Sequence, residues 1–308
     1  MSIKRRDFLK TAAGSGLMLA AGTSTAWGAS AESKMPPEAV GILYDSNLCI
    51  GCQACMTACK QANNMPAEHS GATNLWDNPL DLSAKTLNII KMYSQGEESA
   101  FVKRQCLHCL EPSCVAACPV SALRKDPKTG VVTYHKDACI GCRYCQIACP
   151  YNVPKFEWDD PFPQIRKCQL CDHLYDQGRY AACCWSCPTG ASLFGPVEEL
   201  KKEAKRRLLM EPGQYYEFPV NHIQKGKKVS HRAKEYVNHI YGLEELGGTQ
   251  VMLLSGTDFQ KLGLPELKDT SYVQDLEGIT KGLYKYLLYP AAALGGLVYL
   301  VNKRGEHE

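Results

Sequence analysis

The sequence lacks the short motifs that mark nucleotide, flavin and covalent haem sites. It has no G-x-G-x-x-G and no G-x-x-x-x-G-K followed by Ser or Thr, so dinucleotide and nucleoside-triphosphate sites have no support. It has no C-x-x-C-H, which excludes attachment of a c-type haem. No nucleophile is accompanied by a recognisable base. The chain therefore shows no sign of a catalytic site of its own.

A strong excess of charge is also missing. The net charge is +3, and the first 31 residues supply all of it, with Lys4, Arg5, Arg6 and Lys10 against Asp7. The remainder of the chain is neutral overall. A nucleic-acid partner therefore has no electrostatic support.

Cysteine, in contrast, is abundant, with 17 among 308 residues. The run CIGCRYCQIACP, from Cys139 to Pro150, has the spacing C-x2-C-x2-C-x3-C-P. In bacterial proteins this spacing binds 4Fe–4S clusters: three thiolates hold one cluster and the fourth reaches a second. A disulfide scaffold is the alternative for an exported cysteine-rich chain. Because related runs occur three more times, the cluster interpretation is favoured.

The cysteines form four groups, which predict sixteen ligands and four 4Fe–4S clusters. The groups are Cys49, Cys52, Cys55 and Cys59; Cys106, Cys109, Cys114 and Cys118; Cys139, Cys142, Cys145 and Cys149; and Cys168, Cys171, Cys183 and Cys187. Since the other groups end in C-x3-C, Cys183 keeps the register, and the additional Cys184 is predicted to be a buried apolar residue. Zinc is the alternative metal, but three cysteines in one tight loop suit a cubane better.

The groups also show an internal duplication. Tyr44 precedes Cys49 at the same interval as Tyr134 precedes Cys139, and Ile-Gly-Cys follows in both places. The second group, preceded by VKRQ, resembles the fourth, preceded by QIRK. Duplication of a two-motif unit is the simplest explanation.

Turn residues at 126–130 separate two short strand candidates between the second and third groups, as at the centre of a two-cluster ferredoxin. The second and third groups should therefore form one module, and the first and fourth the other. The predicted fold is α+β, with two ferredoxin-like modules that each hold two 4Fe–4S clusters. Its parts are a ferredoxin-type domain at 32–196, an inner module at about 100–150, an outer module from about 40–60 and 160–196, a hairpin insertion at 60–105, and a C-terminal extension at 197–278 with a helix at 197–209.

Residues 1–31 predict an export signal. Arg5 and Arg6 are followed by Phe-Leu-Lys, an apolar run and a small-residue cleavage site, which is typical of a twin-arginine signal peptide. This route carries folded proteins, so clusters can be inserted in the reducing cytoplasm before export.

Residues 279–302 predict a single transmembrane anchor. The stretch from Leu283 to Val301 has Lys285 as its only charge and matches the length of a spanning helix. The basic residues that follow place the tail at 303–308 in the cytoplasm. An apolar helix buried against a partner protein is the alternative.

Five basic residues flank the predicted ligands: Lys103, Arg104, Arg143, Arg166 and Lys167. Charge near a cluster shifts its reduction potential, so these side chains are candidates for tuning it. Ordinary surface solubility is the alternative for each of them.

With these residues laid out, the sequence resembles the four-cluster ferredoxin-type subunits of membrane-bound respiratory oxidoreductases. The segments that carry the resemblance are KRRDFLK, LYDSNLCIGCQAC, SALRKDPKTGVV, ACIGCRYCQIACPYNVPKF, GGTQVMLLSG and the apolar tail followed by KR. Within this family it is most similar to the iron–sulfur subunit of hydrogenase-2 type nickel–iron hydrogenases. The cysteine pattern alone is shared with electron-transfer subunits of formate dehydrogenase, dimethyl sulfoxide reductase and nitrite reductase, and with a sulfate-reducer cytochrome-complex subunit.

The resemblance implies a crossed ligation, in which each group lends its last cysteine to a neighbouring cluster. The implied sets are Cys49, Cys52 and Cys55 with Cys187; Cys168, Cys171 and Cys183 with Cys59; Cys106, Cys109 and Cys114 with Cys149; and Cys139, Cys142 and Cys145 with Cys118. The sequence departs from the family pattern at Lys60, where proline follows the other groups, and at Cys184.

The resemblance also implies an electron-transfer subunit without a substrate site, anchored on the periplasmic side of the cytoplasmic membrane. Its expected partners are the small and large subunits of a hydrogenase and an integral membrane quinone-reactive subunit. The alternative catalytic partner is a molybdenum or tungsten enzyme such as formate dehydrogenase. A disulfide-stapled structural protein of the cell envelope is a further alternative, which would lack the brown absorbance that dithionite bleaches in clusters.

Changing Arg5-Arg6 to Lys-Lys tests the export signal. Because these arginines act as an address and not as part of the fold, the variant should carry its clusters but stay in the cytoplasm. Cell fractionation followed by iron analysis measures both properties. Normal export of the variant would contradict the prediction.

Overall fold

The described residues of the computed structural model are 34–69, 75–275, 294–296 and 298–299. The predicted signal peptide at 1–31 lies outside them, and so does most of the predicted anchor at 279–302. Within the described ranges, no helix is long and apolar enough to cross a membrane. The described residues from Met35 onward belong to one unit, so the predicted C-terminal extension is not separate from the cysteine-rich part.

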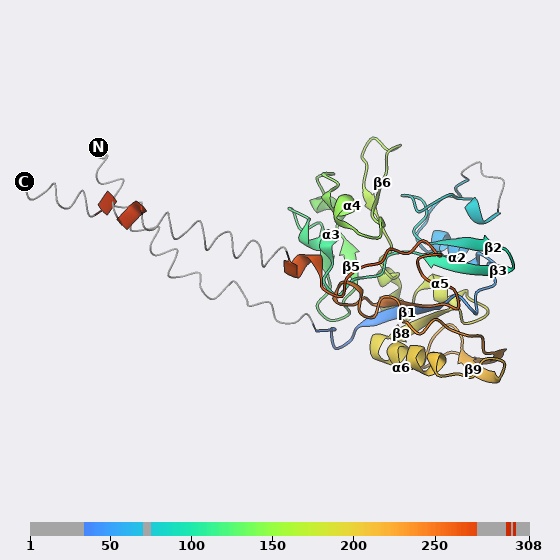
Figure 1. Ribbon diagram of the computed structural model, residues 1–308. Coiled ribbons are helices and arrows are strands. Elements are labelled where there is room, and N and C mark those ends of the chain that lie inside the picture. Colours follow the sequence, from blue (N-terminus) through green and yellow to red (C-terminus); the bar gives the residue numbers. More distant parts are fainter. Residues whose placement is uncertain (1–33, 70–74, 276–293, 297, 300–308) are drawn as a thin grey trace, which may run out of the picture. The chain divides into compact units, whose positions relative to one another are not determined.

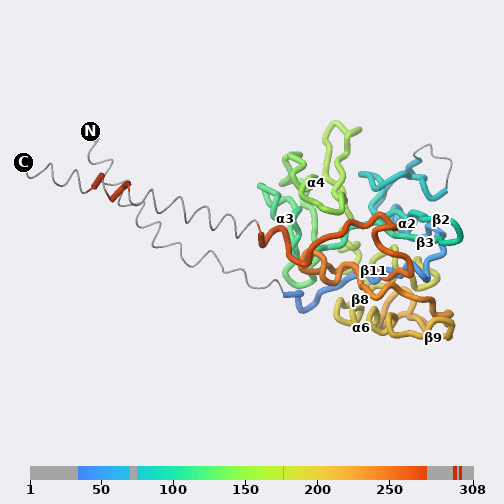
Figure 2. Tube along the Cα trace, viewed as in Figure 1, coloured from blue at the N-terminus to red at the C-terminus, as the bar shows by residue number. Residues whose placement is uncertain are grey.

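A three-stranded sheet joins three distant parts of the sequence (Figure 1). Its middle strand is β1 (Val40–Asp45), which leads into the first cysteine group. β1 pairs antiparallel with β8 (Ser192–Pro196), which follows the fourth group, and parallel with β11 (Val251–Leu254) of the C-terminal extension. Figure 2 shows β8 and the orange chain of β11, which flank β1 from either side, in the same part of the protein.

Both faces of this sheet are buried, each against different partners. Leu43 packs with Leu200 of α6 (Val197–Leu208), which covers one face (Figure 1). Neighbouring residues of a strand point to opposite faces, so Ile42 and Tyr44 lie on the other side. There they join the hydrophobic cluster that contains cysteines of the first, second and fourth groups.

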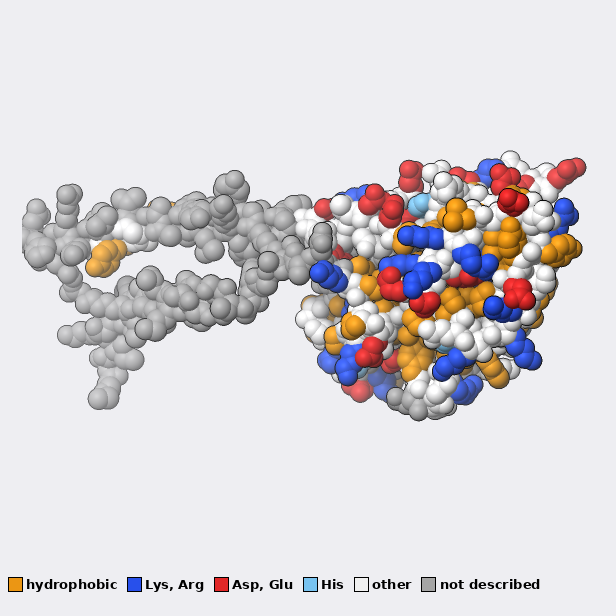
Figure 3. All heavy atoms as spheres, turned by 90° about the horizontal axis from the view of Figure 1, so that it is seen from below, with side chains coloured by type: hydrophobic (Ala, Val, Ile, Leu, Met, Phe, Trp, Pro, Cys, Tyr) orange, Lys and Arg blue, Asp and Glu red, His pale blue; other side chains and the backbone are white. Residues whose placement is uncertain are grey.

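The helix α6 forms where the sequence predicts one at 197–209. Glu198 and Glu199 lie in its first turn, where negative charge complements the helix dipole. Lys201 and Lys202 pair with them at 2.9 Å. The face of the protein that carries α6, seen in Figure 3, mixes basic, acidic and hydrophobic side chains.

The remaining strands form four antiparallel hairpins. They are β2 (Ile89–Gln95) with β3 (Glu98–Arg104), β4 (Leu123–Lys125) with β5 (Val132–Tyr134), β6 (Lys155–Phe156) with β7 (Ile165–Arg166), and β9 (Tyr215–Pro219) with β10 (Lys228–Arg232). The first pair is the hairpin that the sequence predicts within the insertion, with Gly96 in its turn at a φ of 61°. The second pair encloses the predicted turn at 126–130.

Each cysteine group contributes a short helix. The helices are α2 (Ala54–Ala62), α3 (Ser113–Ala116), α4 (Tyr144–Ala148) and α5 (Ala182–Trp185), and the 3-10 turns are η1 (Leu75–Asp77), η2 (Lys136–Ala138), η3 (Asp172–Gln177) and η4 (Glu245–Gly247). α2 packs against α5, and α3 packs against α4. The first group therefore lies with the fourth and the second with the third, as predicted from the turn residues between the second and third groups.

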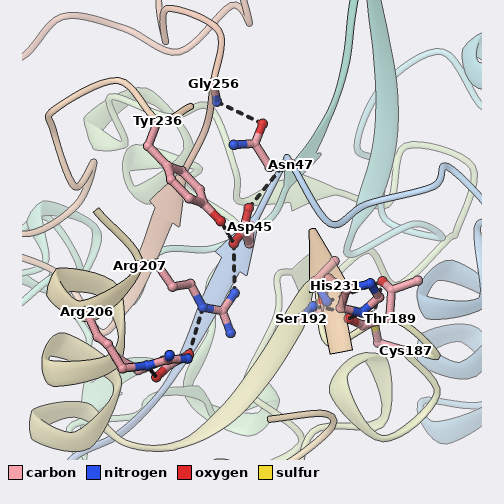
Figure 4. Close-up of polar contacts among 12 residues, drawn as sticks. Asp45, Asn47, Cys187, Thr189, Ser192, Arg206, Arg207, His231, Tyr236 and Gly256 are labelled. Carbon is pink, nitrogen blue, oxygen red and sulfur yellow. Dashed lines mark hydrogen bonds and ion pairs between the residues drawn. The ribbon is translucent and has the colours of Figure 1, made fainter. Parts of the chain in front are cut away.

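A buried ionic network fastens the C-terminal extension to β1 (Figure 4). Arg207 of α6 donates from Nη1 to Asp45 Oδ2 at 2.8 Å and from Nε to Glu203 Oε1 at 2.9 Å. The hydroxyl of Tyr236 donates to the same oxygen of Asp45 at 2.7 Å. The side chains of Asp45 and Arg207 are fully buried. Since Asp45 ends the strand that enters the first cysteine loop, this network fixes the start of that loop.

Replacing Arg207 with Ala should strongly destabilise the protein, because it leaves the carboxylate of Asp45 buried without a counter-charge. Breaking a buried pair in this way costs about 3–5 kcal/mol. The control is Arg206→Ala, since Arg206 also pairs with Glu203 but its side chain is 43% exposed; exposed pairs contribute about 0–1 kcal/mol. Denaturant unfolding followed by circular dichroism measures both. Equal shifts in the two variants would contradict the prediction.

Candidate iron–sulfur sites

The first and third cysteine loops share one backbone conformation. Gly51 and Gly141, just before the second cysteine of each loop, have φ angles of 68° and 69°. Gln53 and Arg143, just after it, have φ angles of 58° and 63°. Left-handed residues in such loops turn successive backbone N–H groups toward one point, which forms an anion-binding concavity. Glycine is required at Gly51 because an added Cβ would lie 2.5 Å from the ring of Phe101.

The second and fourth cysteine loops also share a backbone conformation. His108 and Leu170, just before the second cysteine of the second and fourth groups, both have a φ of 50°. Three residues after the last cysteine of three groups, Ser121, Asn152 and Gly190 have φ angles of 52°, 52° and 76°. The duplication that the sequence predicts is therefore visible in the dihedral angles.

The structure brings the sixteen predicted ligands together as four sets of thiols. Set I is Cys49, Cys52, Cys55 and Cys187; set II is Cys59, Cys168, Cys171 and Cys183; set III is Cys106, Cys109, Cys114 and Cys149; set IV is Cys118, Cys139, Cys142 and Cys145. Each set contains three cysteines of one group and one cysteine of another. All 17 cysteines of the chain are free thiols.

Sets I and IV each line a hollow with mostly apolar walls. Tyr44 and Ile90 also line the hollow of set I, together with Ser192. Leu123 and Ile165 also line the hollow of set IV. Both hollows lie between a cysteine loop and the last cysteine of another group, so neither exists until the loops pack together.

The thiols of sets II and III are close enough to repel one another when ionised. The pKa of Cys59 is raised well above its usual range, mainly by burial and then by the other three thiolates of set II. Burial, followed by the other three thiolates of set III, does the same for the pKa of Cys109. Each of these cysteines is thus surrounded by the three remaining members of its set.

The four sets follow one another in the order I, II, III, IV. At each junction, burial raises the pKa of one thiol, and a thiolate of the neighbouring set raises it further. The junction pairs are Cys55 with Cys183, Cys168 with Cys106, and Cys114 with Cys145. Sets II and III form the middle of this row, and sets I and IV form its ends.

The residues present fit 4Fe–4S cubanes. Backbone N–H groups donate to ligand sulfurs, as in the pairs Ser192 to Cys187 at 3.4 Å, Leu170 to Cys168 at 3.4 Å, Gly141 to Cys139 at 3.4 Å and Ala122 to Cys118 at 3.1 Å. Four converging buried thiolates need positive charge at their centre, which the iron of a cubane supplies. In the part of the chain that the structure describes, no three His, Cys, Asp or Glu side chains are placed to hold a single metal ion.

The adjacent Cys183 and Cys184 have different surroundings. Cys183 lies among the other thiols of set II. Burial, and to a smaller extent the thiolate of Cys183, raises the pKa of Cys171 to about 11. A hydrogen bond from Cys184, opposed by burial and supported by Lys103, lowers the pKa of Cys183 itself to about 5. Cys184 is completely buried. Its thiolate adds to the burial of Tyr180 in raising the pKa of that tyrosine.

Sequence reasoning assigned no role to residues 210–278, but Asn221 supports the last ligand of set I. Its side-chain amide donates to the carbonyls of Cys184, Trp185 and Cys187 at 2.8, 2.9 and 3.0 Å. These bonds hold the turn between α5 and Pro188. Asn221 has a left-handed φ of 68°, and an asparagine in a turn is a feature that the sequence can predict. The sequence does not predict the hydrogen-bond partners of that asparagine.

Gln250, within the GGTQVMLLSG segment, joins the parts of the chain that the sequence predicts as the outer and inner modules. Its side-chain amide donates to the carbonyls of Val40 at 2.8 Å and Thr129 at 2.7 Å, and its backbone N–H donates to Leu107 at 3.1 Å. Val40 begins the strand of the outer module, whereas Thr129 and Leu107 belong to the inner module. The residue therefore fixes the two modules side by side.

Comparison with known proteins agrees with this geometry. Residues 98–197 match the family described as a 4Fe–4S dicluster domain. The chain is 43% identical to the hydrogenase-2 operon protein HybA of Escherichia coli O157:H7, over 99% of this chain and 97% of that protein. It belongs to the ferredoxin-type iron–sulfur electron-transfer subunits of respiratory oxidoreductases. Its cofactors are 4Fe–4S clusters, and its 17 cysteines suffice for four of them.

Other members of this family serve different enzymes. The nitrate-inducible formate dehydrogenase iron–sulfur subunit of Escherichia coli K12 is 33% identical, over 83% of this chain and 80% of that protein. The formate dehydrogenase iron–sulfur subunit of Haemophilus influenzae is also 33% identical, over 83% of this chain and 76% of that protein.

Substituting Ser for either of the adjacent cysteines tests the register of the fourth group. Cys184→Ser should keep all clusters, because Cys184 is not a predicted ligand and a serine hydroxyl can still donate a hydrogen bond to the sulfur of Cys183. Cys183→Ser should lose or convert one cluster, because it removes a thiolate of set II. Electron paramagnetic resonance of the reduced protein distinguishes the two variants. Loss of a cluster in Cys184→Ser together with a silent Cys183→Ser would show that the register is wrong.

Proposed function

We propose that this chain is an exported, membrane-anchored subunit that relays electrons between a hydrogenase and a quinone-reactive membrane subunit. The observation that carries the proposal is the row of four thiol sets. Every cysteine of set II is buried, whereas Cys52 of set I is exposed. A row that runs from one exposed end through a buried interior suits conduction through the protein.

The proposed ligands are the sixteen cysteines of sets I to IV, each set holding one 4Fe–4S cluster, and Cys184 is not a ligand. When bound, the clusters supply the one-electron chemistry. The protein contributes the thiolates, the N–H groups that donate to them, and the apolar walls that exclude water. The described residues offer no substrate site, so one partner must supply the electrons and a second must accept them.

Exposed apolar side chains at both ends of the row support contacts with these partners. Ile50, beside set I, is 60% exposed. Ile140, beside set IV, is 65% exposed, and Tyr144 and Ile147 of α4 are 58% and 83% exposed. Grouped exposed apolar residues of this kind mark interaction surfaces.

The choice of catalytic partner rests on similarity over the whole chain. The relative with 43% identity is named for the hydrogenase-2 operon, which supports a hydrogenase. A formate dehydrogenase is the second candidate, supported by relatives with 33% identity that are named as its iron–sulfur subunits.

The proposed location is the periplasmic side of the cytoplasmic membrane. It is supported by the twin arginine Arg5-Arg6 and by the apolar stretch within 279–302, both features of the sequence. The same apolar stretch supports an integral membrane partner, since quinones are confined to the membrane.

Anaerobic purification of the native complex through a tag on this chain tests the proposal. The chain should carry about sixteen iron and about sixteen acid-labile sulfide atoms, four of each per cubane. Its visible absorbance should bleach with hydrogen alone and recover when a water-soluble quinone is added. Bleaching with formate and not with hydrogen would favour the second candidate. A colourless protein with disulfides would contradict both.

A further inference from the structure

Lys103 is a buried cation between two of the thiol sets. It lies on β3, and the residue is 2% exposed. Its ammonium donates to the hydroxyl of Ser192 at 3.2 Å. No carboxylate of the described residues lies within ion-pairing distance of it. The other buried lysine beside the ligands, Lys167, differs in donating to two backbone carbonyls, those of Val132 and Cys168.

A buried ammonium without a counter-charge is strongly unfavourable, so the charge of Lys103 needs an anion nearby. The sulfurs that face it are those of Cys183 of set II, Cys55 of set I and the adjacent Cys184. Ser192, which the ammonium contacts, lines the hollow of set I and donates its backbone N–H to Cys187. The lysine therefore lies where sets I and II meet.

We infer that Lys103 is the shared counter-ion of the clusters held by sets I and II and raises the reduction potential of both. This inference rests on the proposed cluster sites. Each electron that a cubane accepts adds one negative charge to it. A fixed positive charge in a water-excluded site stabilises the reduced form more than the oxidised form. Because Lys103 faces both sets, a single charge acts on the first two positions of the row.

Redox titration of the full-length protein, followed by electron paramagnetic resonance, tests the inference with three variants. Lys103→Gln keeps a donor for Ser192 but removes the charge, and Lys103→Met removes both. In each, two of the four clusters should become at least tenfold harder to reduce, about 59 mV for a one-electron couple. The other two should be unaffected. Lys103→Arg keeps the charge and should stay close to the unmodified protein.

A matched control is Lys91→Met, on the paired strand β2, because the ammonium of Lys91 already pairs with Asp77 at 2.5 Å. It should leave all four potentials unchanged. If Lys103→Gln has full iron and unchanged potentials, the inference is overturned while the proposed function stands. If removing the charge abolishes iron binding but Lys103→Arg retains it, the counter-ion role is supported. Equal iron loss in all three variants would overturn it, and absence of iron from the unmodified protein would overturn the proposed function as well.

Discussion

The structure depends on confining sixteen thiols at close range in an apolar interior. Burial raises the pKa of most of these groups, and each thiolate raises the pKa of its neighbours, so the sets are unfavourable without compensating positive charge. Backbone N–H groups aimed at sulfur offset part of this cost, and left-handed residues such as Gly51 and Gly141 make that aim possible. Iron supplies the rest. Such a site couples cofactor binding to folding, because the sets form only when separate loops pack together.

The C-terminal extension works as a support for these loops. Its strand β11 lies beside β1, its helix α6 covers the sheet, and Arg207 holds the end of β1 through Asp45. Asn221 and Gln250 then reach the carbonyl groups of the fourth-group turn and of the inner module. The C-terminal extension contributes no cysteine to the thiol sets, but its contacts fix the separation between them.

The internal duplication produces two modules of like design but unlike surroundings. Gly51 and Gly141 adopt nearly the same φ, yet an added Cβ would lie 2.5 Å from the ring of Phe101 at the first and 3.6 Å from that of Phe156 at the second. The insertion that carries Phe101 also carries Lys103, so it places an aromatic ring and a buried cation beside set I. Set IV, at the other end of the row, has the exposed Arg143 in its lining instead of a buried lysine. Clusters held by similar loops are thereby given different electrostatic environments.

The sequence by itself determined what is local. The sequence predicts the cysteine groups from the spacing within each loop, the hairpin within 60–105 and the helix at 197–209, because each signal lies within one turn or one element. The pairing of the cysteine groups also followed from the sequence, because the turn residues at 126–130 place the second group with the third and leave the first with the fourth. The tertiary structure alone decided the order of the four sets, the burial of Lys103 between two of them, and the contacts of Asn221, Arg207 and Gln250. These depend on distances between segments that are far apart in the chain. Packing determines such distances, and the local spacing of residues does not encode them.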